Sequence, residues 1–95
     1  MRKHIVAGNW KMNNDLAATA GLITDLKRKV NNGDAEVIIA PTYINLHSAF
    51  ESLSDSNITV AAQNMHRAKS GAYTGEISAA MLKSVGVNTV ILGHS

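Results

Sequence analysis

This sequence predicts an α/β protein built on a parallel β-sheet. Four short runs rich in β-branched and small apolar residues have the length of strands, and each is nearly continuous in its apolar character rather than alternating. That pattern is typical of strands in a parallel sheet that is covered on both faces. Segments with apolar residues at helical spacing lie between the strands. The predicted strands cover residues 5–8, 37–40, 58–62 and 89–92.

The segment after the first strand has the spacing of a helix with one apolar face. Asn14 or Asp15 can cap its start, because a short polar side chain at that position accepts a hydrogen bond from a free backbone N–H. Gly33 can supply the left-handed residue at which the helix stops. The side chains expected to face inward are Leu16, Ala20, Ile23, Leu26 and Val30.

Two further helices are expected, the second over about residues 43–53 and the third over about 78–85. Pro41 lies in the loop before the second helix, and Gly86 ends the third. The second helix is predicted to bury Leu46, Ala49, Phe50 and Leu53, and the third Ala79, Leu82 and Val85.

The order of elements restricts the topology to a parallel sheet with right-handed crossovers. The order is strand, helix, strand, helix, strand, long loop, helix, strand, and no repeat or flexible linker interrupts it. We therefore predict one domain over residues 1–95 with no internal boundary. An eight-fold β/α barrel needs about 250 residues, so these residues could form only part of one. Periodicity alone leaves both an open doubly wound sheet and half a barrel possible.

Composition argues against several classes of partner. Nine Lys and Arg stand against seven Asp and Glu, for a net charge of +2, and only four aromatic residues are present, which gives no basis for a nucleic-acid or membrane partner. The absence of cysteine excludes a disulfide scaffold. The basic start is followed by too short an apolar run for a signal peptide. We expect a soluble, cytoplasmic protein.

Polar residues follow three of the four predicted strands, at the edge where parallel β/α proteins bind ligands. This set offers a cation, amides, an imidazole and a hydroxyl on one rim, which suits an anionic substrate with a polarised carbonyl group. It consists of Asn9 and Lys11 after the first strand, Gln63 and Asn64 after the third, and His94 and Ser95 after the fourth.

Each of these residues also has an ordinary structural interpretation. An isolated Lys11 would more often be a solvated loop lysine, and Asn9 or Asn64 could satisfy loop backbone groups. An isolated His94 would more often be a hydrogen-bonded, partly buried histidine than a catalytic one. The other histidines, His4, His47 and His66, lack metal-ligand spacing. The glycine-rich stretch 71–75 lacks the ending of a phosphate-binding P-loop.

Four sequence blocks shift this balance. Residues 7–12 (AGNWKM), 62–64 (AQN), 71–78 (GAYTGEIS) and 91–95 (ILGHS) resemble the triosephosphate isomerase family in order and in spacing, and the likeness covers the whole chain. The resemblance implies a (β/α)8 TIM barrel, of which this chain would supply about the first half, with four parallel strands and three helices.

The resemblance also implies a reaction and the residues that serve it. The reaction is the interconversion of dihydroxyacetone phosphate and glyceraldehyde 3-phosphate through an enediolate, without cofactor or metal. Lys11 would hold the phosphate and favour negative charge on the substrate oxygens, and Asn9 would donate to the same oxygens. His94 would be the electrophile that donates to the carbonyl, and Ser95 would lie beside the catalytic carboxylate.

The long loop from 64 to 78 resembles the dimerisation loop of that family. Thr74 and Glu76 lie in this loop, and Thr74 would support Asn9 of a second copy of the chain, while Met12 would be enclosed by the partner's loop. The expected partner is therefore a homodimer mate.

The family's glutamate base, closing lid and later phosphate loops are not among these 95 residues, so we expect the chain alone to be inactive. Two alternatives remain at this stage. One is a non-catalytic half-barrel fragment that acts as a folding or complementation unit. The other is an open-sheet binding module that shares only the strand-end pattern.

Overall fold

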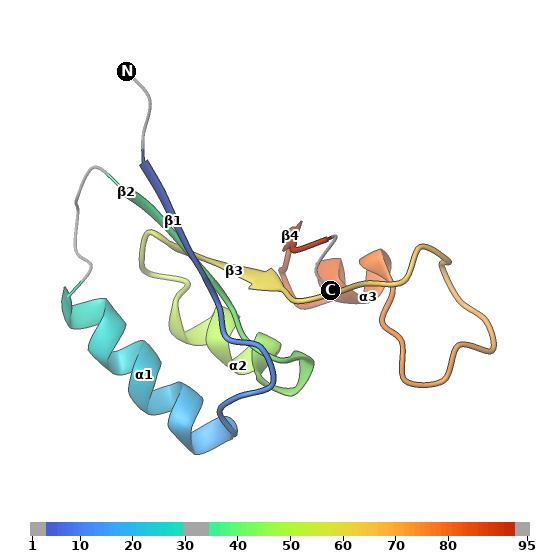
Figure 1. The fold of residues 1–95 in the computed structure, drawn as a ribbon, viewed down its shortest axis with the longest axis horizontal. Coiled ribbons are helices and arrows are strands. Elements are labelled where there is room, and N and C mark those ends of the chain that lie inside the picture. Colours follow the sequence, from blue (N-terminus) through green and yellow to red (C-terminus); the bar gives the residue numbers. More distant parts are fainter. Residues whose placement is uncertain (1–3, 30–34, 93–95) are drawn as a thin grey trace.

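Four strands and three helices alternate along the chain in the computed structural model, which describes residues 4–29 and 35–92 (Figure 1). The strands are β1 (His4–Asn9), β2 (Ala35–Ala40), β3 (Ile58–Ala62) and β4 (Thr89–Val90). The helices are α1 (Leu16–Lys29), α2 (Tyr43–Ser52) and α3 (Ala79–Ser84).

The strands form one sheet in the order β1-β2-β3-β4, and every neighbouring pair is parallel. Asn9 lies opposite Ala40 in the register, so β1 and β2 end side by side. In Figure 1, α1 and α2 lie together on one side of the strands, while α3 lies beside β4. This arrangement confirms the predicted α/β class, and a sequential parallel sheet is the order found in half of a (β/α)8 barrel.

The core lies between β2, β3 and the helices that follow them. β3 is the most enclosed strand, since four of its five residues are buried. An apolar cluster joins this strand to one face of α2 and to the turn after α3, which explains why the continuous apolar run at 58–62 was a reliable predictor. Its buried members are Ile23, Ile39, Leu46, Ala49, Leu53, Ile58, Val60, Ala62, Leu82 and Val87.

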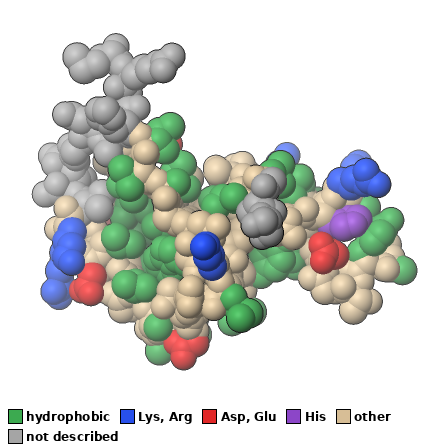
Figure 2. Space-filling model, in the orientation of Figure 1, with side chains coloured by type: hydrophobic (Ala, Val, Ile, Leu, Met, Phe, Trp, Pro, Cys, Tyr) green, Lys and Arg blue, Asp and Glu red, His purple; other side chains and the backbone are tan. Residues whose placement is uncertain are grey.

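Burial of β1 differs from the prediction. Its apolar run was expected to be covered on both faces, yet Ile5 is 64% exposed and Val6 is 56% exposed. These adjacent side chains point to opposite faces of the sheet, so both faces of β1 are open. The physical reason is its position: β1 is the edge strand, and it pairs only with β2 among the described residues. Figure 2 shows hydrophobic side chains at the surface over the region where Figure 1 draws β1 and β2.

The inward face of α1 is also shifted from the predicted one. Leu16 and Ala20 were expected inside, but both are exposed, whereas the polar Thr19 is only 1% exposed. Ile23 is buried as expected and Leu26 is partly buried against the core. The helix therefore packs along Thr19, Ile23 and Leu26, a stripe with helical spacing that hydrophobicity alone missed because one member is a threonine.

The helix ends follow the predicted signals where the structure describes them. The Asp15 Oδ1 atom accepts a hydrogen bond from the Ala18 N–H at 2.9 Å, so Asp15, not Asn14, is the N-cap of α1. Gly86 ends α3 with φ of +92°, as predicted. Ser78 was expected to be the first residue of that helix, but it is the N-cap and accepts from the Met81 N–H at 3.2 Å. The predicted stop at Gly33 and the expected burial of Val30 fall outside the described residues.

The last strand is shorter than predicted, because only Thr89 and Val90 pair with β3. The Ile91 N–H still donates to the Ala62 carbonyl at 2.9 Å, but Leu92 is 64% exposed. β4 is the second edge of the described sheet, so one neighbour alone holds it.

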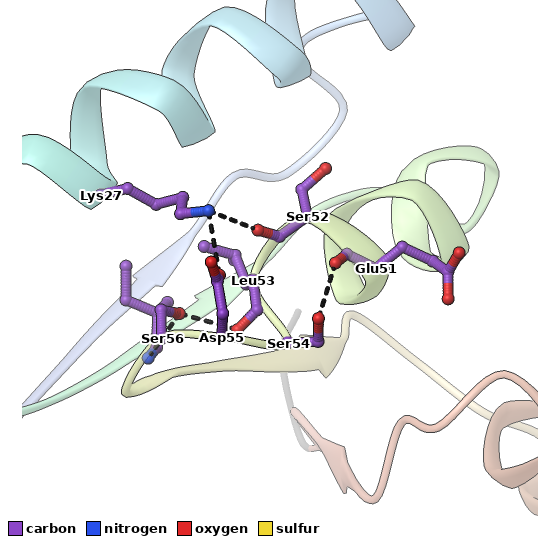
Figure 3. A network of polar contacts seen from close by, with 8 residues as sticks. Lys27, Glu51, Ser52, Leu53, Ser54, Asp55 and Ser56 are labelled. Atoms are coloured by element: carbon purple, nitrogen blue, oxygen red, sulfur yellow. Dashed lines mark hydrogen bonds and ion pairs between the residues drawn. The ribbon is translucent and has the colours of Figure 1, made fainter.

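A polar network fixes the C-terminal end of α2 (Figure 3). The Lys27 Nζ atom of α1 donates to the Ser52 carbonyl at 3.0 Å and lies 2.9 Å from the Asp55 Oδ1 atom. A cation at a helix C-terminus satisfies carbonyls that lack partners within the helix. Ser54 and Ser56 donate their hydroxyls to the carbonyls of Glu51 and Leu53. The network ties α1 to the turn that leads into β3.

Candidate functional site

The carboxyl ends of β1 and β2 form the rim on which the predicted site lies. The Trp10 N–H donates to the Ala40 carbonyl at 3.1 Å, which continues the pairing of the two strands by one residue. The Asn9 Oδ1 atom accepts a hydrogen bond from the Lys11 N–H at 2.9 Å. Asn9 and Lys11 are both exposed, so the amide and the cation are open to a ligand that reaches the rim.

Gln63 joins this rim to β3. Its Nε2 group donates to the Lys11 carbonyl at 2.6 Å and to the Ala40 carbonyl at 2.9 Å. One side-chain amide has two N–H donors, and here both go to backbone carbonyls from neighbouring strand ends. The sequence predicted Gln63 as a polar residue on the rim; the structure gives it the task of holding the segment that carries Lys11.

The backbone of this segment is unusual. Lys11 has φ of 53° and Asn14 has φ of 72°, although neither is glycine. The left-handed conformation costs an ordinary residue about 1–2 kcal/mol, and such residues persist where the surrounding structure holds them, often at functional sites. The observed outliers therefore favour a functional interpretation of the β1–α1 loop over that of a loop that only connects two elements.

Asn45 is the buried residue that sequence reasoning missed. It lies in the first turn of α2, has 0% exposure, and donates from Nδ2 to the Asn14 carbonyl at 2.9 Å. The sequence did hold a signal, because Asn45 lies four residues before Ala49 and therefore on the apolar face of α2. A polar residue at a core position of a helix usually has a specific hydrogen-bonding partner.

The loop between β3 and α3 projects away from the sheet (Figure 1). Its base is closed by a hydrogen bond from the His66 N–H to the Ile77 carbonyl at 2.7 Å, and the rings of His66 and Tyr73 lie 4.1 Å apart between centroids. Gly71 and Gly75 take left-handed φ values of 135° and 87°. Figure 2 shows histidine and charged side chains of both signs gathered around this loop.

Residues predicted to serve dimerisation lie on exposed segments. Thr74 is exposed in the projecting loop, and Met12 is 92% exposed in the β1–α1 loop. Glu76 is exposed and acts on Tyr43 of α2, whose pKa is raised above 10.0 chiefly by burial and further by the Glu76 charge. The Tyr43 hydroxyl is buried without a hydrogen-bonding partner in the described part of the chain.

The structure thus brings together some of the predicted site residues. Asn9, Lys11 and Gln63 are linked by hydrogen bonds, and Asn64 is exposed next to them. His94 and Ser95 fall outside the described residues. Within residues 4–29 and 35–92, no three His, Asp or Glu side chains lie together as a metal site would require, and no described helix is long and apolar enough to cross a membrane.

The fold and this rim define a class of protein: a parallel β/α protein with a lysine and side-chain amides at the carboxyl ends of its strands, where such proteins bind substrates. A family model described as triosephosphate isomerase matches residues 4–95. The chain belongs to the triosephosphate isomerase family.

Individual relatives agree with this assignment. The chain is 64% identical to a triosephosphate isomerase of Flavobacterium psychrophilum, 56% to one of Flavobacterium johnsoniae and 52% to one of Clostridium acetobutylicum. Each match covers 100% of this chain and 38% of the relative. The chain therefore spans well under half the length of these curated relatives.

Proposed function

We propose that this chain is the N-terminal part of a triosephosphate isomerase, which interconverts dihydroxyacetone phosphate and glyceraldehyde 3-phosphate. The observation that carries the proposal is the β1–α1 loop, in which an exposed Lys11 has a left-handed backbone and its carbonyl accepts from Gln63. An exposed lysine whose backbone is held in advance at this rim suits a phosphorylated substrate that gains negative charge during reaction.

In this proposal Lys11 binds the phosphate and stabilises the enediolate. The Asn9 Oδ1 atom already accepts from the Lys11 N–H, which leaves the Asn9 amide N–H groups to donate to substrate oxygens. His94 donates a hydrogen bond to the substrate carbonyl, and Ser95 lies beside the base. Donors fixed before reaction lower the barrier because no solvent has to reorganise around the new charge.

We propose that the base comes from sequence outside this chain. Among the described acids, Asp15 caps α1 and Asp55 pairs with Lys27, so both are engaged away from the rim. We propose that residues 1–95 are one part of a single barrel domain, whose remaining βα units supply the base and complete the phosphate site. We propose that neither a cofactor nor a metal takes part, because Lys11 and His94 would stabilise the negative charge that develops on the substrate oxygens.

We further propose that the complete protein is a cytoplasmic homodimer. The loop that carries Thr74 and Glu76 extends from the sheet, and Met12 presents an almost fully exposed apolar side chain. Burial of such surface against a second copy would remove it from water. Thr74 of one copy would then support Asn9 of the other.

A second candidate function rests on β1. This six-residue edge strand leaves backbone groups on one side unpaired by the described residues and exposes Ile5 and Val6. Such an edge invites pairing with another chain. The chain by itself could therefore serve as a folding or complementation unit that joins a separately made second part.

The test compares two proteins. One is this chain alone, and the other is the completed chain, meaning residues 1–95 followed by the sequence that continues beyond the match in the Flavobacterium psychrophilum relative. A coupled assay with glyceraldehyde 3-phosphate should show turnover by the completed chain, loss of turnover on His94→Gln, and none by the chain alone. A folded completed chain without activity would contradict the proposal. Activity regained by mixing residues 1–95 with the separately made remainder of the completed chain would support the complementation role.

A further inference from the structure

The β1–α1 loop is held from two different βα units. After the strained Lys11 the chain passes through Met12 and Asn13 to a second left-handed residue, Asn14, and then enters α1. Gln63 of the β3 end accounts for the hold on Lys11. The Asn13 Nδ2 group donates to the Trp10 carbonyl at 2.8 Å within the loop, and a separate contact holds Asn14.

Asn45 of α2 makes that separate contact across 31 positions of sequence. Its Nδ2 group donates to the Asn14 carbonyl at 2.9 Å and to the Thr42 Oγ1 atom at 3.0 Å, which uses both amide protons. The side chain is fully buried, so water does not compete for these protons.

The Asn45 Oδ1 atom distinguishes a role in hydrogen bonding from a role in packing alone. The Asn45 Oδ1 atom is buried and has no hydrogen-bonding partner within the described residues. Burial of an unpaired acceptor is unfavourable, so a leucine of similar size would suit a role in packing alone better. What asparagine adds at this position is the donation to the Asn14 carbonyl and to Thr42.

We propose that Asn45 is a positioning residue for Lys11: by fixing Asn14 it holds the far end of the loop and thereby sets where the Lys11 side chain meets the substrate. The link to substrate rests on the proposed function, whereas the hold on the loop does not. Asn45 acts through the backbone and touches no reacting atom.

The test uses the completed chain with Asn45→Leu. Loss of two hydrogen bonds lowers the thermal midpoint and removal of the unpaired buried oxygen raises it, so the midpoint should change little, while amide exchange over residues 11–15 becomes faster. The KM for glyceraldehyde 3-phosphate should rise by about tenfold, the effect of one lost ordering contact on ligand affinity, with a smaller change in kcat. The matched control is Thr42→Val, which removes the other acceptor and should leave loop exchange and KM unchanged.

Each outcome decides a different point. Unchanged exchange over residues 11–15 in Asn45→Leu overturns the hold on the loop, and faster exchange with an unchanged KM overturns the positioning of Lys11. If Asn45→Leu does not fold, Asn45→Ala decides the same points, because it removes the donor without placing a larger side chain in the core. A folded, unmutated completed chain with no turnover would contradict the proposed function. The exchange measurement would still test whether Asn45 holds the loop at Asn14.

Discussion

Replacing Gln63 with leucine removes a single amide that holds two neighbouring strand ends. Its Nε2 group donates to the Lys11 and Ala40 carbonyls at 2.6 and 2.9 Å. A protein hydrogen bond has a net value of about 1 kcal/mol, so the completed chain should lose about 2 kcal/mol of unfolding free energy. The left-handed Lys11 costs a comparable amount, about 1–2 kcal/mol, so the loop should also leave its strained conformation.

Urea unfolding followed by circular dichroism measures the first effect, and amide exchange at Lys11 measures the second. Asn64→Ala changes the adjacent exposed residue and should alter neither quantity. Gln63→Glu sharpens the test, because a carboxylate cannot donate to the two carbonyls but a protonated carboxyl group can donate to one of them. At pH 7 the Gln63→Glu protein should therefore lose more unfolding free energy than the Gln63→Leu protein, and this loss should become smaller in acid. A Gln63→Leu protein within 0.5 kcal/mol of the unmutated one, with unchanged exchange at Lys11, would refute the reasoning.

Three further predictions concern stability of the completed chain, each measured by urea unfolding. Gly86→Ala should lower the unfolding free energy by about 2 kcal/mol, because φ is +92° and a Cβ atom there would lie closer than 3.0 Å to the Phe50 ring. Gly21→Ala, at an open helical position, should raise it by about 0.5–1 kcal/mol. Equal effects of the two changes would contradict a special role of glycine at position 86. Tyr43→Phe should raise the unfolding free energy by about 1 kcal/mol at pH 7, because it removes an unpaired buried hydroxyl. This difference should grow above pH 10, because the raised pKa of Tyr43 means that the unmutated protein loses stability as pH rises toward the folded-state pKa. Lys27 lowers the pKa of the Asp55 carboxyl below 3.8, chiefly by a hydrogen bond and further by its charge. The unmutated protein should therefore have a slightly higher unfolding free energy than Asp55→Asn above that pH, and the difference should vanish as pH falls through the lower folded-state pKa. A difference that persists in strong acid would argue against the ion pair.

The sequence was most informative where one physical signal determines a structure. The apolar run at 58–62 predicted a buried strand, since such runs are typical of strands that are covered on both faces. Asp15 and Gly86 predicted helix ends because caps depend on local backbone geometry. These features need no knowledge of distant residues.

Features that depend on distant neighbours were missed. The exposure of Ile5 and Val6 follows from the edge position of β1, which no property of the strand itself reveals. Thr19 replaces the expected leucine on the inner face of α1 because packing against α2 selects the face.

The candidate site shows the same division. Asn9, Lys11 and Gln63 were predicted because they follow strands, and the structure joins them by hydrogen bonds. The left-handed Asn14 and its buried partner Asn45 were not predicted, since their contact spans 31 positions of sequence. The roles of Asn9 and Lys11 in binding substrate, and those of His94 and Ser95, remain predictions.

The most direct test of the central claim is the kcat/KM of the completed chain with Lys11 changed to methionine, which keeps the length of the side chain and removes its charge. Loss of one fixed electrostatic contact to developing charge costs about 10²–10³-fold in rate, and we expect a fall of at least that size. Lys11→Arg should restore only part of it, because the guanidinium group is larger and directs its donors differently. A Lys11→Met protein that keeps kcat/KM within threefold of the unmutated one would contradict the account.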